Sequence, residues 1–115
     1  SMALQSRDVI DAMTTASGTP LEELRVDGGA SVMELLLQLQ ADHLGAEVVR
    51  PTSDETTALG AAFLAGLAEG VWTDLDDLTA HWAEERRVYP TTDRTAVDAA
   101  HHQWLRAVQR SRDWA

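Results

Sequence analysis

Apolar residues recur along the chain with two different periods, and each change of period marks an expected element. Residues 3–17 show a helical spacing, which a glycine and a proline end soon afterwards. Alternation over 24–26 predicts a short strand. Apolar residues then cover most of the helix circumference over 30–44, which predicts a helix buried on more than one side. With a second strand over 47–50, this half of the chain predicts a βαβ unit with parallel strands.

The second half of the chain predicts helices. A helix over 56–69 is rich in alanine and glycine, which indicates close packing against a neighbour, because an internal glycine otherwise costs about 1 kcal/mol. We expect a short helix over 74–82, an extended connector over 84–90 and a last helix over 93–110. The fold class is therefore a helix-rich α/β fold.

Two strands are few for such a chain, because an isolated strand pair is marginally stable. We therefore expect the βαβ unit to belong to a wider sheet whose other strands lie outside this sequence. A sheet edge or face left open in this way would expose apolar surface. This predicts a homodimer, formed through strand pairing or swapped helices.

Composition narrows the class of protein. The chain has 115 residues, is 44% hydrophobic and carries a formal net charge of -10. That charge argues against nucleic acid as a partner, because neutralising phosphates requires clustered lysine and arginine. The chain has no cysteine, no apolar run long enough to cross a membrane and no secretory signal, so a cytoplasmic protein is expected. Ser1 and Met2 are interpreted as an expression scar.

The candidate chemistry lies at the turn between the first strand and the helix that follows it. Gly28 and Gly29 allow a sharp turn or close approach of the backbone to a ligand, often a phosphate. An ordinary tight turn is the alternative. Asp27 is expected either to bind magnesium through water or to cap a helix beginning at Ala30. Ser31 could reach a phosphate or satisfy a backbone N–H in the first turn.

Other polar and aromatic residues are assigned structural roles. The tryptophans are expected to anchor the C-terminal helices, and residues 53–56 supply capping groups for the helix that follows. The acidic residues from Asp74 to Glu85 do not form a calcium loop, because Thr79 occupies the position that requires glycine. No ligand spacing supports a metal site among the four histidines, which are His43, His81, His101 and His102.

Several stretches resemble the C-terminal end of glycerol kinases. The matching segments are VDGGA at 26–30, LLQLQ at 36–40, VVRP at 48–51 and ETTALGAAFLAGLA at 55–68, continued by ERR at 85–87, Trp104, Ala107-Val108 and Arg110-Ser111. The resemblance covers nearly the whole chain. It implies an FGGY carbohydrate kinase, with residues 3–115 as the C-terminal part of the nucleotide-binding domain of a partial actin-like, ribonuclease H-like ATPase fold.

The resemblance also implies an activity, and it implies which functional groups come from this segment and which from other parts of the protein. Glycerol kinases transfer the γ-phosphoryl group of ATP to glycerol with Mg²⁺, and their catalytic aspartate and glycerol contacts come from sequence upstream of this segment. No catalytic residue and no metal ligand are therefore expected here. The similar segment lies against ADP, which points to Gly28, Gly29 and Ala30 as contacts. Met33 occupies the position of an asparagine that reaches the adenine region, and a thioether cannot make the amide's hydrogen bonds.

The sequence leaves three interpretations of the function open. The chain is expected to supply the adenine-nucleotide side of a kinase cleft, to need an N-terminal kinase domain as its partner, and to be inactive alone. It could instead belong to another FGGY sugar kinase. A degenerate, non-catalytic interaction module is the third interpretation, and Met33, which we otherwise expect in the core, motivates it.

Overall fold

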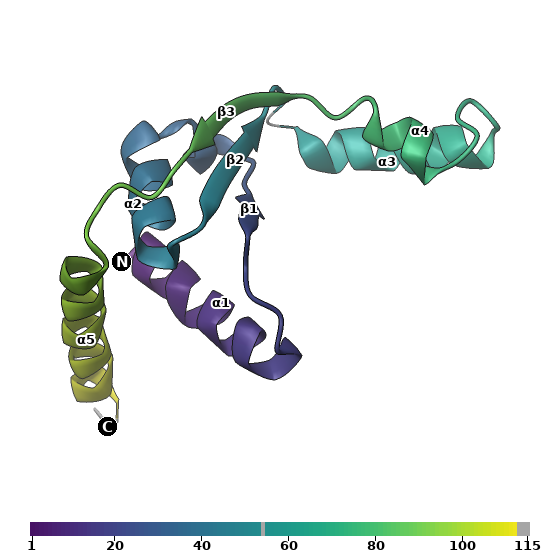
Figure 1. Ribbon diagram of the computed structural model, residues 1–115. Helices are drawn as coiled ribbons and strands as arrows, with labels where there is room; N and C mark the ends of the chain where they lie inside the picture. The colour runs from purple at the N-terminus through teal and green to yellow at the C-terminus, as the bar shows by residue number, and fades with distance from the viewer. Residues whose placement is uncertain (54, 113–115) are drawn as a thin grey trace.

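The computed structural model describes residues 1–53 and 55–112, arranged as a small sheet from which helices extend (Figure 1). Within these residues the elements are, in chain order, α1 (Met2–Ser17), β1 (Glu23–Arg25), the 3-10 helix η1 (Gly29–Val32), α2 (Glu34–Leu44), β2 (Glu47–Pro51), α3 (Thr56–Ala68), α4 (Leu75–Thr79), β3 (Glu84–Val88) and α5 (Arg94–Ser111). Asp54 and Trp114, for which the sequence predicted capping and anchoring roles, lie outside the described residues.

The sheet has the strand order β1-β2-β3. β1 and β2 are parallel, with Leu24 opposite Val48, and the connection between them contains α2. The predicted βαβ unit is confirmed. α2 packs on β2 and β3, and both α1 and α5 pack on α2. The sheet, α2 and α1 form the body of the molecule.

The third strand was not expected, and the prediction of a connector over 84–90 is wrong. β3 pairs antiparallel with β2, with Val88 opposite Val48 and Arg87 opposite Val49. Its first four residues are charged, a composition typical of edge strands, where charge blocks further pairing. Arg87 binds the carboxylates of Glu23 on β1 and Glu47 on β2, so ion pairs across the sheet replace the apolar alternation that would have revealed the strand.

The core lies between α2 and the sheet. Leu37 and Ala41 of α2 pack with Val48 and Val88 of the sheet, and side chains of β1 pack against this cluster. Leu37, Val48 and Val49 are the largest fully buried side chains. Burial of such side chains stabilises a fold by roughly 1.5–3 kcal/mol each, so this small contact region holds the body together.

α2 packs against the sheet, α1 and α5, so the expectation of a helix buried on more than one side is confirmed, but one stripe of the helix stays exposed. It starts at Glu34 rather than at residue 30, because the preceding residues form η1. Leu36 and Leu37 are buried, whereas Leu35 is 71% exposed and Leu39 is also exposed. The apolar pattern correctly predicts a helix, but nothing in the described part of the chain covers its outer face.

α3 and α4 form an arm that projects from the end of the sheet (Figure 1). Trp72 joins the two helices, because its ring packs edge-to-face on Phe63 at 5.3 Å and on His81 at 5.9 Å. The small residues of α3 permit this contact at Gly66, where an added Cβ would lie 1.8 Å from the Trp72 ring, but nothing lies within 4 Å of a Cβ at Gly60. The predicted close packing is therefore confirmed at one end of the helix.

The molecule is extended for its length. Its radius of gyration is 17.5 Å, whereas a compact chain of this size has a value of about 13 Å. The arm and α5 account for the difference, since they leave the body in different directions (Figure 1). None of the helices in the described residues is long and apolar enough to cross a membrane.

Candidate functional site

The glycine turn leads from the end of β1 directly into η1. Val26 donates its backbone N–H to Val49 at 2.9 Å, which is the last contact with β2 before the chain turns. Gly28 has φ 79° and ψ 175°, a conformation that a side chain disfavours. Gly29 has no such constraint, and a Cβ added at Gly28 or Gly29 would meet nothing within 4 Å. The backbone at Gly29 is therefore open to an approaching molecule.

Ser31 closes the turn internally. Its hydroxyl donates to the carbonyl oxygen of Gly28 at 2.7 Å, and its backbone N–H donates to the same oxygen at 2.9 Å. The side chain is buried. Of the two predicted roles, the local backbone role is the one the structure shows. Its partner is a carbonyl rather than an N–H.

Arg50 fixes the turn against the sheet, a role that the sequence analysis missed. Its guanidinium donates to the Ser31 carbonyl oxygen at 2.8 Å and forms ion pairs with Glu85 at 3.0 Å and Glu34 at 3.6 Å. These contacts join η1, α2 and the two strands β2 and β3. A lone arginine in a short strand gives no sequence signal for this role, because its partners come from three separate segments.

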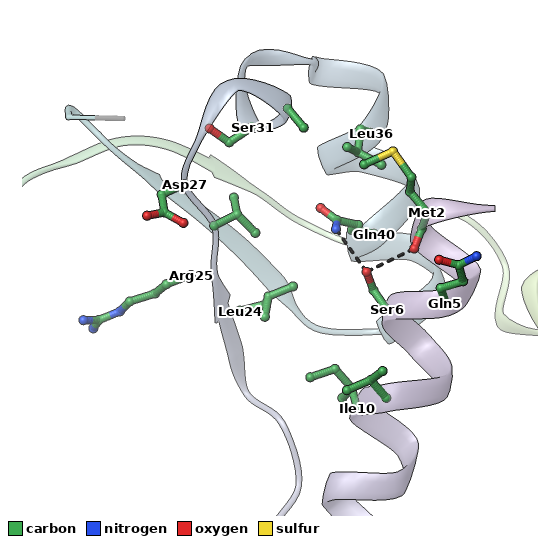
Figure 2. Close-up of a pocket in the computed structure, with 13 residues that line it drawn as sticks. Met2, Gln5, Ser6, Ile10, Leu24, Arg25, Asp27, Ser31, Leu36 and Gln40 are labelled. Carbon is green, nitrogen blue, oxygen red and sulfur yellow. Dashed lines mark hydrogen bonds between the residues drawn. The ribbon is translucent and has the colours of Figure 1, made fainter. Parts of the chain in front are cut away.

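Asp27 does not cap a helix. No helix begins at Ala30, and η1 has Gly28 as its N-cap residue without a side-chain hydrogen bond. Asp27 is exposed at the end of β1. Figure 2 shows its carboxylate pointing away from α1, on the same side of the strand as Arg25. The position leaves the carboxylate accessible from the carboxyl ends of the strands.

Met33 lies at the surface, and the prediction that it belongs to the core is wrong. It is the N-cap residue of α2 and is 54% exposed. Its carbonyl oxygen accepts backbone hydrogen bonds from Leu36 at 2.9 Å and Leu37 at 3.1 Å. The backbone thus starts the helix, while the thioether lines a hollow of about 360 Å³ beside Leu35 and Leu39.

Two grooves flank the glycine turn. The first has a volume of about 560 Å³ and lies between α1 and the β1–η1 segment, with Ile10, Leu24 and Leu36 among its apolar walls (Figure 2). The second, of about 360 Å³, lies between the strand ends and α3 and includes Phe63 and Trp82. Arg25, Val26 and Asp27 line both grooves, so the chain just before the glycines separates them, and Gly28 and Gly29 themselves line neither groove.

The charges near the turn are few and mostly paired. Arg25 binds Glu23 at 2.9 Å and stacks over the Trp82 ring at 4.4 Å from its centroid. The described residues contain no group of three or more histidine or acidic side chains that could hold a metal ion. The surface around the turn offers the open backbone of Gly29, the exposed carboxylate of Asp27 and the aromatic side chains of Phe63 and Trp82. These groups suit the binding of a ligand rather than bond-breaking chemistry.

Comparison with known proteins identifies the class. Residues 1–69 match the C-terminal domain of the FGGY family of carbohydrate kinases. The chain belongs to this family, and the resemblance inferred from the glycine turn and the ETTALGAAFLAGLA segment is confirmed.

The relatives narrow the likeness to glycerol kinases. The chain is 54% identical to the glycerol kinase of Mycolicibacterium vanbaalenii over 96% of its own length and 22% of that protein. It is 51% identical to the glycerol kinase of Aromatoleum aromaticum, over 98% of this chain and 23% of that one. The chain therefore spans less than a quarter of the length of the curated relatives it matches.

Solved structures show the same arrangement. The crystal structure of Plasmodium falciparum glycerol kinase with ADP matches 99% of this chain and 23% of its own, with a TM-score of 0.85 and 27% identity. The xylulose kinase of Rhodospirillum rubrum matches 95% of the chain with a TM-score of 0.76 and 20% identity, which shows the fold alone. The predicted partial actin-like ATPase fold is confirmed.

Proposed function

We propose that this chain is the C-terminal part of an ATP-dependent glycerol kinase and supplies the adenine-nucleotide side of the cleft. The open glycine turn carries the proposal, because it exposes backbone at Gly29 close to Asp27, which lines two grooves. Relatives about half identical to the chain are glycerol kinases, and the solved structure most like it in shape among those described holds ADP. In this reading residues 3–115 belong to the nucleotide-binding domain, and the protein acts in the cytoplasm.

Gly28, Gly29 and Ala30 would contact the phosphates and ribose of ADP through their backbone. Gly29 and Ala30 are both exposed, and Arg50 holds the turn rigid from behind. A rigid, open backbone lets a phosphate approach without the cost of ordering a loop. Asp27, whose carboxylate is exposed, would hold Mg²⁺ through water, since Mg²⁺ binds through one or two carboxylates together with substrate phosphates and keeps several waters.

Met33 would lie beside the adenine ring. Its thioether is exposed and flexible, so it can pack on the face or edge of an aromatic base, although it cannot form an amide's paired hydrogen bonds. We expect weaker selection of adenine over other bases than an asparagine at this position would give.

The chain alone should not catalyse phosphoryl transfer. That reaction depends on positioning and charge stabilisation from both sides of a cleft. The described residues hold no metal-binding cluster, and the chain covers only 22–23% of its kinase relatives. We expect no glycerol 3-phosphate from ATP and glycerol with the purified chain. Formation of that product would contradict the proposal that the catalytic groups come from elsewhere.

Calorimetric titration with ADP tests the binding role directly. We expect saturable binding by the chain and its loss in Gly29→Asp, because a carboxylate at the turn repels phosphate while its Cβ meets no neighbour. Ala107→Asp is the matched control, since it adds the same charge on an exposed position of α5. Absence of heat at millimolar ADP, or equal binding by Gly29→Asp, would refute the nucleotide role.

The extended shape favours a second candidate, an interaction module that forms a homodimer. The radius of gyration exceeds that of a compact chain, and the arm exposes Leu64, Val71 and Leu75. Sedimentation equilibrium over a range of concentrations should then detect a dimer. A monomer at every concentration would remove this candidate and leave the arm to be covered by another part of a kinase.

A further inference from the structure

The contact between α1, α2 and α5 is a partly buried cluster of charged and polar side chains, which we call the three-helix junction. It consists of Arg7 and Asp8 from α1, His43 from α2, and Asp98, His101 and Trp104 from α5. Arg7, His43 and His101 are each less than 9% exposed. Buried polar groups require partners, so the protonation state of this cluster matters for the position of α5.

Direct polar contacts join α1 to α5. The carboxylate of Asp8 accepts a hydrogen bond from the Trp104 indole Nε1 at 2.7 Å and lies 2.7 Å from Nε2 of His101. Arg7 donates to Asp98 at 2.7 Å. These contacts are charge-assisted, which makes them stronger than neutral hydrogen bonds and dependent on the ionisation of each member.

His43 stands apart within the junction. Its Nδ1 is buried and has no hydrogen-bond partner among the described residues, and the same holds for Nη1 of Arg7. Ser1, which carries the N-terminal amine, lines the same hollow as His43. The charged or titratable side chains that act on His43 are those of Arg7 from α1, His101 and Arg94 from α5, and Asp42 from its own helix. Three of these four neighbours are basic side chains, so a proton on the imidazole would be repelled from two helices at once.

The rest of α5 offers little apolar anchorage. Val97 and His101 are its only buried residues in the described part of the helix. Near its start, Arg94 donates to the carbonyl oxygens of Asp42 at 3.3 Å and His43 at 3.1 Å, which hold the helix to the end of α2. The junction is therefore the main attachment of α5 beyond its first turn, whereas the core at Leu37 and Val48 does not involve α5.

We propose that the three-helix junction is an acid-sensitive latch, in which protonation of the buried His43 releases α5 from α1 while the sheet and α2 stay folded. The proton has no acceptor at Nδ1 within the described residues, and it adds charge beside Arg7. Release lets the imidazolium and Arg7 reach water, at the loss of the Asp8 and Asp98 contacts.

The pH range follows from the directions of the shifts. Burial, assisted by Arg7 and His101, lowers the pKa of His43 from its ordinary value of 6.5. The folded junction thus binds fewer protons than the released one, so docking is strongest above pH 6.5 and weakens as the pH falls below it.

The carboxylates respond in a more acidic range. Burial tends to raise the pKa of Asp8, but hydrogen bonds from Trp104 and His101 outweigh it and lower that pKa below 3.8. The hydrogen bond from Arg7 is the main cause that lowers the pKa of Asp98 below the same value. Both acids therefore stay ionised until the pH falls through these lowered values. Of these three groups, His43 is therefore the one whose uptake of a proton on release weakens docking below pH 6.5 while both acids are still ionised.

Nuclear magnetic resonance of the ¹⁵N-labelled chain tests the latch. The indole N–H signal of Trp104, assigned by its absence in Trp104→Phe, reports the contact with Asp8. We expect this signal to move to a solvent-exposed position at a midpoint below pH 6.5, while the amide signals of Leu37 and Val48 stay native. In His43→Gln the midpoint should shift to acid by about one pH unit or more, because the amide cannot be protonated in this range.

The matched control is His102→Gln, which removes the neighbouring histidine at an exposed position of α5. Its midpoint should equal that of the unmodified chain. A midpoint unchanged by His43→Gln, or loss of the Leu37 and Val48 signals together with that of Trp104, would overturn the latch. If His43→Gln does not fold, His43→Leu provides the same test with an apolar side chain.

Discussion

The arm and α5 are attached to the same body in opposite ways. α5 is held by hydrogen bonds and ion pairs whose partners all lie within the chain, such as Arg7 with Asp98 and Asp8 with Trp104. The α3–α4 arm instead has an almost wholly apolar sequence in α3, of which only Gly66 is buried. Leu64 is 65% exposed, and Val71 and Leu75 are exposed as well.

The difference shows which surfaces are complete within this chain. A hydrogen bond or ion pair whose two partners both lie in the chain requires no further surface to satisfy it. A contiguous apolar surface exposed to water, in contrast, usually marks a site where another surface binds. The chain matches less than a quarter of its kinase relatives, and one of them shows the same arrangement within a longer chain. The attachment of α5 is thus internal, whereas no described residue covers the apolar surface of the arm.

The same substitution in the body and in the arm gives the largest contrast. Leu37→Ala removes a fully buried side chain from the core and should destabilise the chain by about 3 kcal/mol. Leu64→Ala removes an exposed leucine and should change stability by no more than about 0.5 kcal/mol. Urea unfolding followed by circular dichroism measures both. Equal losses would mean that the arm is covered in solution, and a concentration-dependent midpoint would identify a second copy as the cover.

The sequence predicted elements well where local rules decide them. The helical spacing of α1 ends at Gly18, whose φ of 70° requires the glycine that the pattern indicated. β3 was missed because Arg87 is paired with Glu23 and Glu47 on the other two strands, and such pairing leaves no period in the local sequence. The exposure of Leu35 was missed because periodicity identifies apolar faces without showing whether the covering surface belongs to the same chain.

The site was predictable to a similar extent. The conformation of Gly28 is a local requirement, so the turn could be located from two adjacent glycines after a strand. The role of Arg50 depends on Glu34, Glu85 and the Ser31 carbonyl, which only the fold brings together. Met33 was predicted to lie in the core because its side chain is apolar, but it is the N-cap residue of α2 and lies at the surface.

Asp42 provides the next largest expected effect, because it fixes the turn that leads from β3 into α5. Its carboxylate accepts hydrogen bonds from the backbone N–H groups of Thr91 at 2.7 Å and Thr92 at 3.1 Å, and from the Thr92 hydroxyl at 2.7 Å. Asp42→Ala removes these acceptors and should destabilise the chain by about 2 kcal/mol. Asp93→Ala is the control, because Asp93 precedes α5 without a side-chain capping bond.

The pH dependence of the Asp42 contribution has a defined sign. Burial tends to raise its pKa, but the hydrogen bonds from Thr91 and Thr92 outweigh it and lower the pKa from 3.8 to about 2. Its stabilisation is therefore complete above pH 3.8 and is lost as the pH falls through about 2. The difference in unfolding free energy between the unmodified chain and Asp42→Ala should narrow over that range. A difference that is constant with pH would show that the carboxylate charge does not hold the turn.

The smallest expected effect separates the two ends of α3. At Gly66 an added Cβ would lie 1.8 Å from Trp72, so Gly66→Ala must displace the ring that joins α3 to α4. Overpacking of this kind costs about 1–3 kcal/mol, and the gain in helix propensity of about 1 kcal/mol offsets part of it. Gly60→Ala meets nothing within 4 Å and should stabilise α3 by about 0.5–1 kcal/mol. Hydrogen exchange of the α3 amides should become faster in Gly66→Ala and slower in Gly60→Ala. Slower exchange in both variants would mean that α3 and α4 are independent helices that do not pack on each other through Trp72.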